Sequence, residues 1–206
     1  MTIRFHRHDL PDLARYEGVD AVAVDTETLG LKPHRDRLCV VQLSPGDGTA
    51  DVVQIAAGQK RAPNLAALLR NRRITKLFHY ARFDLAVLYH AFGVMPQPVF
   101  CTKIASRLTR TYTDRHGLKD VCAELLGVSL SKVQQSSDWA AEELSQEQLE
   151  YAASDVLHLH RLRDALTARL ERERRTGEAE ACFRFLPTRA RLDLMGWEDV
   201  DIFAHS

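Results

Sequence analysis

Several signals that would fix a protein's class are missing from this chain of 206 residues. It has no run of roughly 18 apolar residues, and its first ten residues lack the apolar stretch of a signal peptide. We therefore expect a soluble, cytoplasmic protein that does not enter a membrane. The 4 cysteines are widely scattered and form no CxxC pair, so we expect reduced, mostly buried thiols.

Nitrogen- or sulfur-based metal sites and broad basic surfaces are also disfavoured. The 9 histidines form no HExxH motif, and the nearest pairs are two residues apart, which points them to different sides of a helix. The 28 Lys+Arg balance the 28 Asp+Glu, with a sequence pI near 7.1. A protein that coats long duplexes must neutralise many phosphates, so any contact with nucleic acid here should be local.

Strands dominate the first part of the chain and helices the rest. The β-branched stretches at residues 21–26 and 38–44, with a third strand at 51–55, predict an antiparallel meander. A strand at 75–79 should feed a helix at 81–92. Further helices are expected after a cap at Asn64 and at residues 102–108, 117–126 and 146–172. This order predicts an α/β fold, a mixed sheet flanked by helices in a single domain.

The last thirty residues differ from the rest. We expect one folded domain to span residues 1–176 and an apolar tail to follow at 177–206. A disordered tail would not carry so many large apolar side chains. The tail should therefore pack on this domain or on a neighbouring subunit.

Two carboxylates end the first predicted strand. Asp25 and Glu27 are two residues apart, and the two-residue period of a strand puts both on one face of the sheet. Close like charges repel, and burial raises the cost unless cations neutralise them. Bound metal would remove the repulsion, whereas the alternative is a capped strand end that turns into the loop at Gly30. The dipeptide alone leaves both interpretations open.

Two further acids occupy helix positions where an apolar side chain is expected. Asp84 lies in one row with Leu88, and Asp155 shares a face with Ala152, one turn after Tyr151. Unpaired buried carboxylates are rare, so four of them predict a metal site. Oxygen ligands without His or Cys suit Mg²⁺ or Mn²⁺, and two such ions promote phosphoryl chemistry. The predicted reaction is phosphodiester hydrolysis.

The ordered motifs resemble those of a known group. DTE at residues 25–27, HYARFDL at 79–85 and YAASD at 151–155 are similar to the three exonuclease motifs of the DEDD superfamily, in its tyrosine subclass. HGLKDV, which starts at His116, resembles a linking segment of the ribonuclease D branch. The resemblance covers roughly residues 21–166 and implies an RNase H-like mixed sheet flanked by helices.

The resemblance also assigns roles by position. It implies that Asp25, Glu27, Asp84 and Asp155 hold two Mg²⁺ or Mn²⁺ ions. Tyr151 would hydrogen-bond the attacking water. Since a free tyrosine titrates near pH 10, we expect Tyr151 to orient the water while the metal supplies acidity. A core aromatic is the alternative for Tyr151 taken alone.

Candidates for substrate contacts are Thr26, Leu31, His79 and Lys119. Leu31 stands where small oligoribonucleases, which the run DTETLGL resembles, wedge a leucine between the two terminal bases. A loop leucine that packs on the core is the alternative. His79 should border the same pocket. The helix start at residues 116–119 could offer amides and a cation to a phosphate, and comparable candidates are Arg82, Lys103 and Arg115.

Within the family, the chain resembles the short nanoRNase C type, an oligomer that acts on very short RNAs. The features that carry this narrower resemblance are the lack of net charge, the leucine at position 31 and the apolar tail. We therefore expect a 3′ to 5′ exoribonuclease that cuts short single-stranded RNA, down to dinucleotides, to nucleoside 5′-monophosphates and forms a homo-oligomer. Alternatives are a ribonuclease D-like trimmer of structured RNA, an exonuclease on DNA, and an inactive RNA-binding scaffold.

Overall fold

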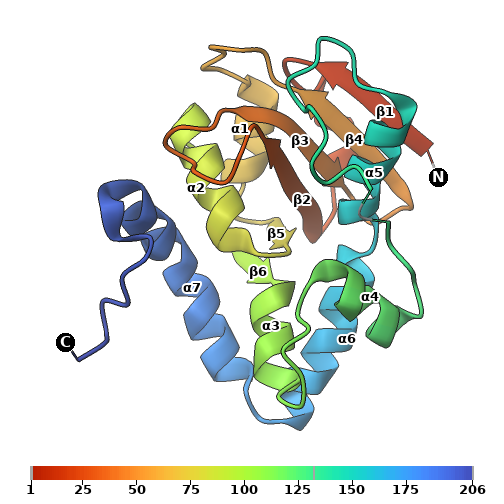
Figure 1. Cartoon of the computed structure of the whole chain (residues 1–206). Helices are drawn as coiled ribbons and strands as arrows, with labels where there is room; N and C mark the ends of the chain where they lie inside the picture. Colours follow the sequence, from red (N-terminus) through yellow and green to blue (C-terminus); the bar gives the residue numbers. More distant parts are fainter. Residues whose placement is uncertain (1, 132, 206) are drawn as a thin grey trace.

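The computed structural model describes residues 2–131 and 133–205, and its centre is a six-stranded mixed sheet (Figure 1). The strands lie in the order β1 (Thr2–Arg7), β4 (Thr49–Gln54), β3 (Leu38–Ser44), β2 (Ala21–Thr28), β5 (Thr75–Phe78) and β6 (Val99–Cys101). β3 is antiparallel to both β2 and β4, which confirms the predicted meander. The other neighbouring strands pair in parallel.

Helices account for most of the remaining chain. They are α1 (Pro63–Arg70), α2 (Ala81–Phe92), α3 (Thr102–Thr109), α4 (Leu118–Leu126), α5 (Gln146–Leu157), α6 (Leu159–Arg172) and α7 (Thr176–Leu192), with a short 3-10 helix η1 (Ala14–Tyr16) and a π-helical turn η2 (Asp193–Trp197). The predicted mixed sheet flanked by helices is confirmed. Within the described part of the chain, no helix is both long and apolar enough to cross a membrane.

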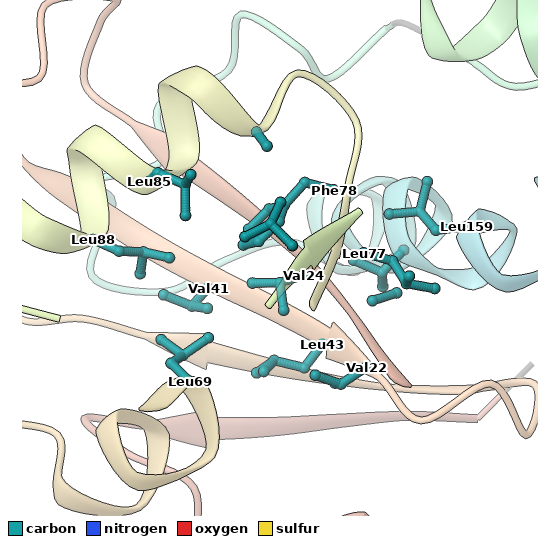
Figure 2. Packing of buried hydrophobic residues seen from close by; sticks show 14 of the residues in the cluster. Val22, Val24, Val41, Leu43, Leu69, Leu77, Phe78, Leu85, Leu88 and Leu159 are labelled. Carbon is teal, nitrogen blue, oxygen red and sulfur yellow. The ribbon is translucent and has the colours of Figure 1, made fainter. Parts of the chain in front are cut away.

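The helices cover both faces of the sheet. Val41 packs in the large core beside α2, and Figure 2 shows it with Val24, Leu85 and Leu88. The neighbouring Val40 belongs to a smaller cluster with Ala152 of α5. Because consecutive strand residues point to opposite faces, α2 and α5 lie on opposite sides of the sheet. α6 continues below the sheet against α3 and α4.

The predicted helix at residues 146–172 is broken at His158. This residue separates α5 from α6 with φ −105° and ψ −6°. α5 packs on β2, β3 and β4, whereas α6 packs on α3 and α4, so the two segments follow different neighbours. The single continuous helix was therefore a wrong prediction, although both segments are helical.

The predicted cap at Asn64 is also wrong. α1 begins at Pro63, two residues before the start that a cap at Asn64 implies, and in the first turn the missing proline N–H costs nothing. A distant aspartate supplies the cap instead: Asp9 accepts hydrogen bonds from the backbone N–H groups of Asn64 and Leu65, both at 2.9 Å. The residue that satisfies the helix end thus comes from the segment after β1.

α7 begins at Thr176, beside the boundary expected between catalytic domain and tail. Most of α7 lies against α2, α3 and β6 (Figure 1), and Phe183 packs against Phe100 with the rings tilted by 45° and their centroids 4.8 Å apart. After α7, the chain is held to the start of α2 by Arg82, which donates two hydrogen bonds to the carboxylate of Asp193, at 2.6 and 2.8 Å. The residues beyond are largely exposed.

Candidate active site

Three of the predicted metal-binding acids meet at the end of β2. Asp25, Glu27 and Asp155 each offer an oxygen, and these oxygens lie within 4.8 Å of one another. Asp25 and Glu27 point to the same side of the strand, which is the side that α5 covers with Asp155. Residues 25 and 155 are thereby brought together by the packing of a helix on a sheet face.

Asp84 approaches this cluster from the other side of the sheet. It lies in the first turn of α2, 2% exposed, and among the described residues it stands outside the group of three. Thr26, which alternation turns away from Asp25, donates its hydroxyl to Asp84 Oδ1 at 2.7 Å. The register of β2 with β5 runs only from Ala21 to Ala23, so α2 can start beside the unpaired end of β2.

Gln42 is a site residue that sequence reasoning missed. It lies opposite Asp25 in the β2–β3 register, is fully buried, and donates its amide Nε2 to Asp25 Oδ2 at 2.9 Å. A carboxylate oxygen that accepts this bond is held in one orientation. The signal in the sequence was a single amide side chain in the mostly apolar run LCVVQLS.

Tyr151 lies one turn before Asp155 on α5. Its ring packs against Trp139, with centroids 6.0 Å apart. The start of α5 is fixed by a capping box, in which Ser145 and Gln148 bond each other's backbone amides. Gln148 also donates to the carbonyl of Asp138 at 3.1 Å, and so ties the loop that carries Trp139 to the helix that carries Tyr151.

The acids cannot all be ionised without a counter-charge. Burial and then the neighbouring carboxylates raise the pKa of Asp25 well above its ordinary value and that of Glu27 to about 9. Burial raises the pKa values of Asp84 and Asp155 to about 7. A site in which several carboxyl groups hold protons near neutral pH fits divalent cations, which favour the ionised forms.

Asp25, Glu27 and Asp155 line a cleft of about 620 Å³. All predicted site residues except Asp84 line it, namely Asp25, Thr26, Glu27, Leu31, His79, Lys119, Tyr151 and Asp155. Leu31 is 83% exposed at the cleft. Asp36 holds the loop that carries Leu31, because its Oδ2 accepts a hydrogen bond from the backbone N–H of Lys32 at 2.9 Å. The same oxygen occupies the space that a Cβ atom at position 30 would need, and Gly30 leaves that space free.

The structure distinguishes between the basic residues that the sequence left as equal candidates for a phosphate contact. Lys103 and Lys119 line the cleft. Arg82 is paired with Asp193, and Arg115 donates to its near neighbour Asp120 at 2.6 and 2.9 Å. The two lysines are therefore the cationic candidates for contacts with a phosphate in the cleft.

Comparison with known proteins agrees with this geometry. A sequence model described as 3'-5' exonuclease matches residues 10–171. The chain belongs to this 3'-5' exonuclease family. The matched range holds the four acids and Tyr151 and ends in the last turn of α6. The motifs that suggested the DEDD superfamily thus point to the right family.

Solved structures show which proteins this chain is similar to in sequence and fold. Brucella melitensis NrnC with bound Mg²⁺ is 76% identical and superposes with a TM-score of 0.97 over 100% of both chains. The same protein bound to pGG is 77% identical, again with a TM-score of 0.97 over 100% of both chains. These matches confirm the resemblance to the short nanoRNase C type.

Longer relatives match this chain over only part of their length. Ribonuclease D of Gluconacetobacter diazotrophicus is 38% identical over 154 residues, which is 75% of this chain and 39% of that protein. The chain spans about two fifths of the length of the curated relatives it matches.

Proposed function

We propose that the chain is a divalent-metal-dependent 3′ to 5′ exoribonuclease that hydrolyses short oligoribonucleotides, down to dinucleotides, to nucleoside 5′-monophosphates. The observation that carries the proposal is the cluster of Asp25, Glu27 and Asp155 on the floor of an open cleft. The match to NrnC bound to pGG supports a short substrate. The described cysteines are free thiols, three of them buried, which fits the cytoplasmic location that we also propose.

Asp25, Glu27, Asp84 and Asp155 would hold two Mg²⁺ or Mn²⁺ ions. Bound there, the ions would make a water more acidic and offset the charge on the leaving oxygen. Burial and the charge of Asp155 raise the pKa of Tyr151, so its hydroxyl keeps its proton. Tyr151 can therefore orient a water by hydrogen bonding without serving as a phenolate base.

Leu31 would contact the bases of a short substrate. An apolar side chain that is 83% exposed at the rim of a catalytic cleft gains by covering the face of a base. Thr26 also lines the cleft, although its hydroxyl is already committed to Asp84. These two contacts stay predictions until a substrate complex is measured.

Substrate length tests this proposal. We expect purified protein with Mg²⁺ or Mn²⁺ to cut two-residue RNA with a higher kcat/KM than five- or twenty-residue RNA, and to release 5′-monophosphates. Leu31→Ala should lower kcat/KM on the dinucleotide about tenfold, since contacts to a base are each worth about 1–3 kcal/mol. The measurement is a time course of labelled products.

The outcomes separate the rival functions. A preference for twenty-residue structured RNA would favour a 3′-end trimmer, and a preference for DNA would favour a DNA-directed exonuclease. Binding of RNA without any cleavage would indicate a scaffold. Leu31→Ala that leaves kcat/KM on the dinucleotide unchanged would remove Leu31 from the substrate contacts.

Residues 177–206 would contribute to a closed homo-oligomer, separate in role from the catalytic unit at 1–176. Beyond α7, Met195 is 67% and Phe203 77% exposed, and apolar side chains this exposed are typical of a contact surface. We expect light scattering to give a multimeric mass, and the Met195→Ser, Phe203→Ser double variant to give a smaller one. A monomeric wild-type protein would contradict this assembly. Point changes are preferable to truncation, because α7 itself packs on the core.

A further inference from the structure

His79 joins two walls of the cleft through its ring. It follows β5 directly, and its Nδ1 lies 2.9 Å from the hydroxyl oxygen of Thr102, the first residue of α3. Its Nε2 lies 3.0 Å from the carbonyl oxygen of His116, two residues before α4. Both ring nitrogens of His79 thus have hydrogen-bond partners within the protein, although the side chain lines the cleft.

The tautomer of His79 follows from these partners. A carbonyl oxygen only accepts, so Nε2 must carry the hydrogen that goes to His116. Burial, and then the charge of Lys103, lower the pKa of His79 to about 3, so the ring is neutral at ordinary pH. Nδ1 is therefore an acceptor, and the single hydroxyl hydrogen of Thr102 is shared between Nδ1 at 2.9 Å and the carbonyl oxygen of Phe78 at 3.1 Å. Neither nitrogen is left to exchange a proton with a substrate.

The segment around His116, whose carbonyl accepts from His79, is itself fixed by further hydrogen bonds. The ring Nδ1 of His116 lies 2.9 Å from Ser106 Oγ, and this oxygen accepts from Arg110 at 3.0 Å. The same Arg110 Nη1 donates to the carbonyl of Arg115 at 2.7 Å. Ser106, Arg110 and His116 are all buried. The chain before α4 can thus keep one position relative to α3.

The two anchors of His79 are close in sequence to the two lysines of the cleft. Thr102 precedes Lys103 directly, and His116 precedes Lys119 by three residues. Lys103 and Lys119 line the cleft together with the acids on its floor. The contacts of the His79 ring therefore connect the segment that carries Lys103 to the segment that carries Lys119. The distance between these two segments sets where the two lysines lie in the cleft.

We infer that His79 is a positioning residue, which sets the spacing of the Lys103 and Lys119 walls and so tunes the affinity of the cleft for the phosphates of a short RNA. This inference rests on the proposed function. His79 would affect substrate affinity only by holding the protein segments around the cleft in place, and its ring would take no part in proton transfer.

Steady-state kinetics on a dinucleotide, with saturating Mg²⁺ or Mn²⁺, tests the inference. We expect His79→Leu to raise KM about tenfold, a change of about one decade in affinity, while kcat stays within about twofold. His79→Gln keeps a donor near the Nε2 position and should restore KM to within about threefold of wild type. Thr102→Val, nearly isosteric, removes the partner of Nδ1 and should raise KM about threefold.

His6→Leu is the matched control. His6 also bonds a buried side chain, since its Nε2 lies 2.8 Å from Asp51 Oδ1, but it stands on β1 at the far edge of the sheet. We expect it to lower the melting temperature without a change in KM. A rise in KM in this control as large as that in His79→Leu would mean that general destabilisation explains both.

The results separate this inference from the proposed function. If wild type cuts the dinucleotide but KM is unchanged in His79→Leu, or kcat alone falls, the positioning role is overturned and the enzyme assignment stands. If His79→Leu does not fold, Thr102→Val decides in the same way. A wild-type protein that cuts no RNA overturns both.

Discussion

Replacing Asp25 with asparagine is expected to lower kcat on a dinucleotide by about 10³-fold or more and to raise the melting temperature of the metal-free protein. The activity falls because one ligand charge is lost, and ligands of a catalytic metal are worth several kcal/mol in the transition state. The stability rises because Asp25 stands among three other acids, and burial and their charges raise its pKa. An asparagine still accepts the bond from Gln42.

Two measurements on one variant test this prediction. The first is kcat with Mg²⁺ or Mn²⁺, and the second is a thermal melt at about pH 8 in EDTA, where the unfolded chain has its carboxyls ionised. A variant within tenfold of wild-type activity would count against Asp25 as a metal ligand. A lower melting temperature in EDTA would show that the bonds made by the Asp25 carboxylate outweigh its repulsion from the other acids.

Tyr151→Phe is the matched control for this pair of measurements. It keeps all four acids and the ring that packs on Trp139, and removes only the hydroxyl. We expect kcat to fall by about 10²-fold, the range of a single proton-handling or water-orienting group. The stabilisation by Mg²⁺ should equal that of wild type, because no ligand is lost.

The periodicity of the sequence identified the parts of the fold that depend on local pattern. β2 and β3 contain mainly apolar and β-branched residues in AVAVDT and LCVVQL, and α2 matches its predicted bounds of 81–92. β1 and β6 were missed. β1 is an edge strand with partly exposed residues in TIRFHR, and β6 has only three residues after a proline-rich stretch, so neither gives a strong strand signal.

Tertiary contacts decided what periodicity could not. Nothing in the sequence at His158 ends a helix, yet the chain turns there because α5 and α6 pack on different partners. The same limit applies to the site. The acids stood out as carboxylates in apolar positions, but the contact between Thr26 and Asp84 and the clamp of Gln42 on Asp25 depend on which strands are neighbours.

In EDTA, the melting temperature is expected to fall as the pH rises from about 7 to 9, and Mg²⁺ should reverse this trend. The pKa values of Asp84 and Asp155 are raised to about 7 and that of Glu27 to about 9. Unfolded carboxyls titrate near pH 4. Between about pH 7 and 9, where His79 is neutral in the folded and the unfolded state alike, the folded state therefore binds more protons than the unfolded state, so stability must decrease with pH.

Metal binding must then displace those protons. The stabilisation by Mg²⁺ at 100 times its Kd is about 2.7 kcal/mol, or roughly 5–10 °C for a domain of this size. Because the ions compete with protons, the shift should be larger at pH 8.5 than at pH 5.5. Calorimetric titrations in buffers of different ionisation enthalpy should show proton release that decreases above pH 9. A shift that is equal at both pH values, without proton release, would mean that Mg²⁺ binds outside the cluster of Asp25, Glu27 and Asp155.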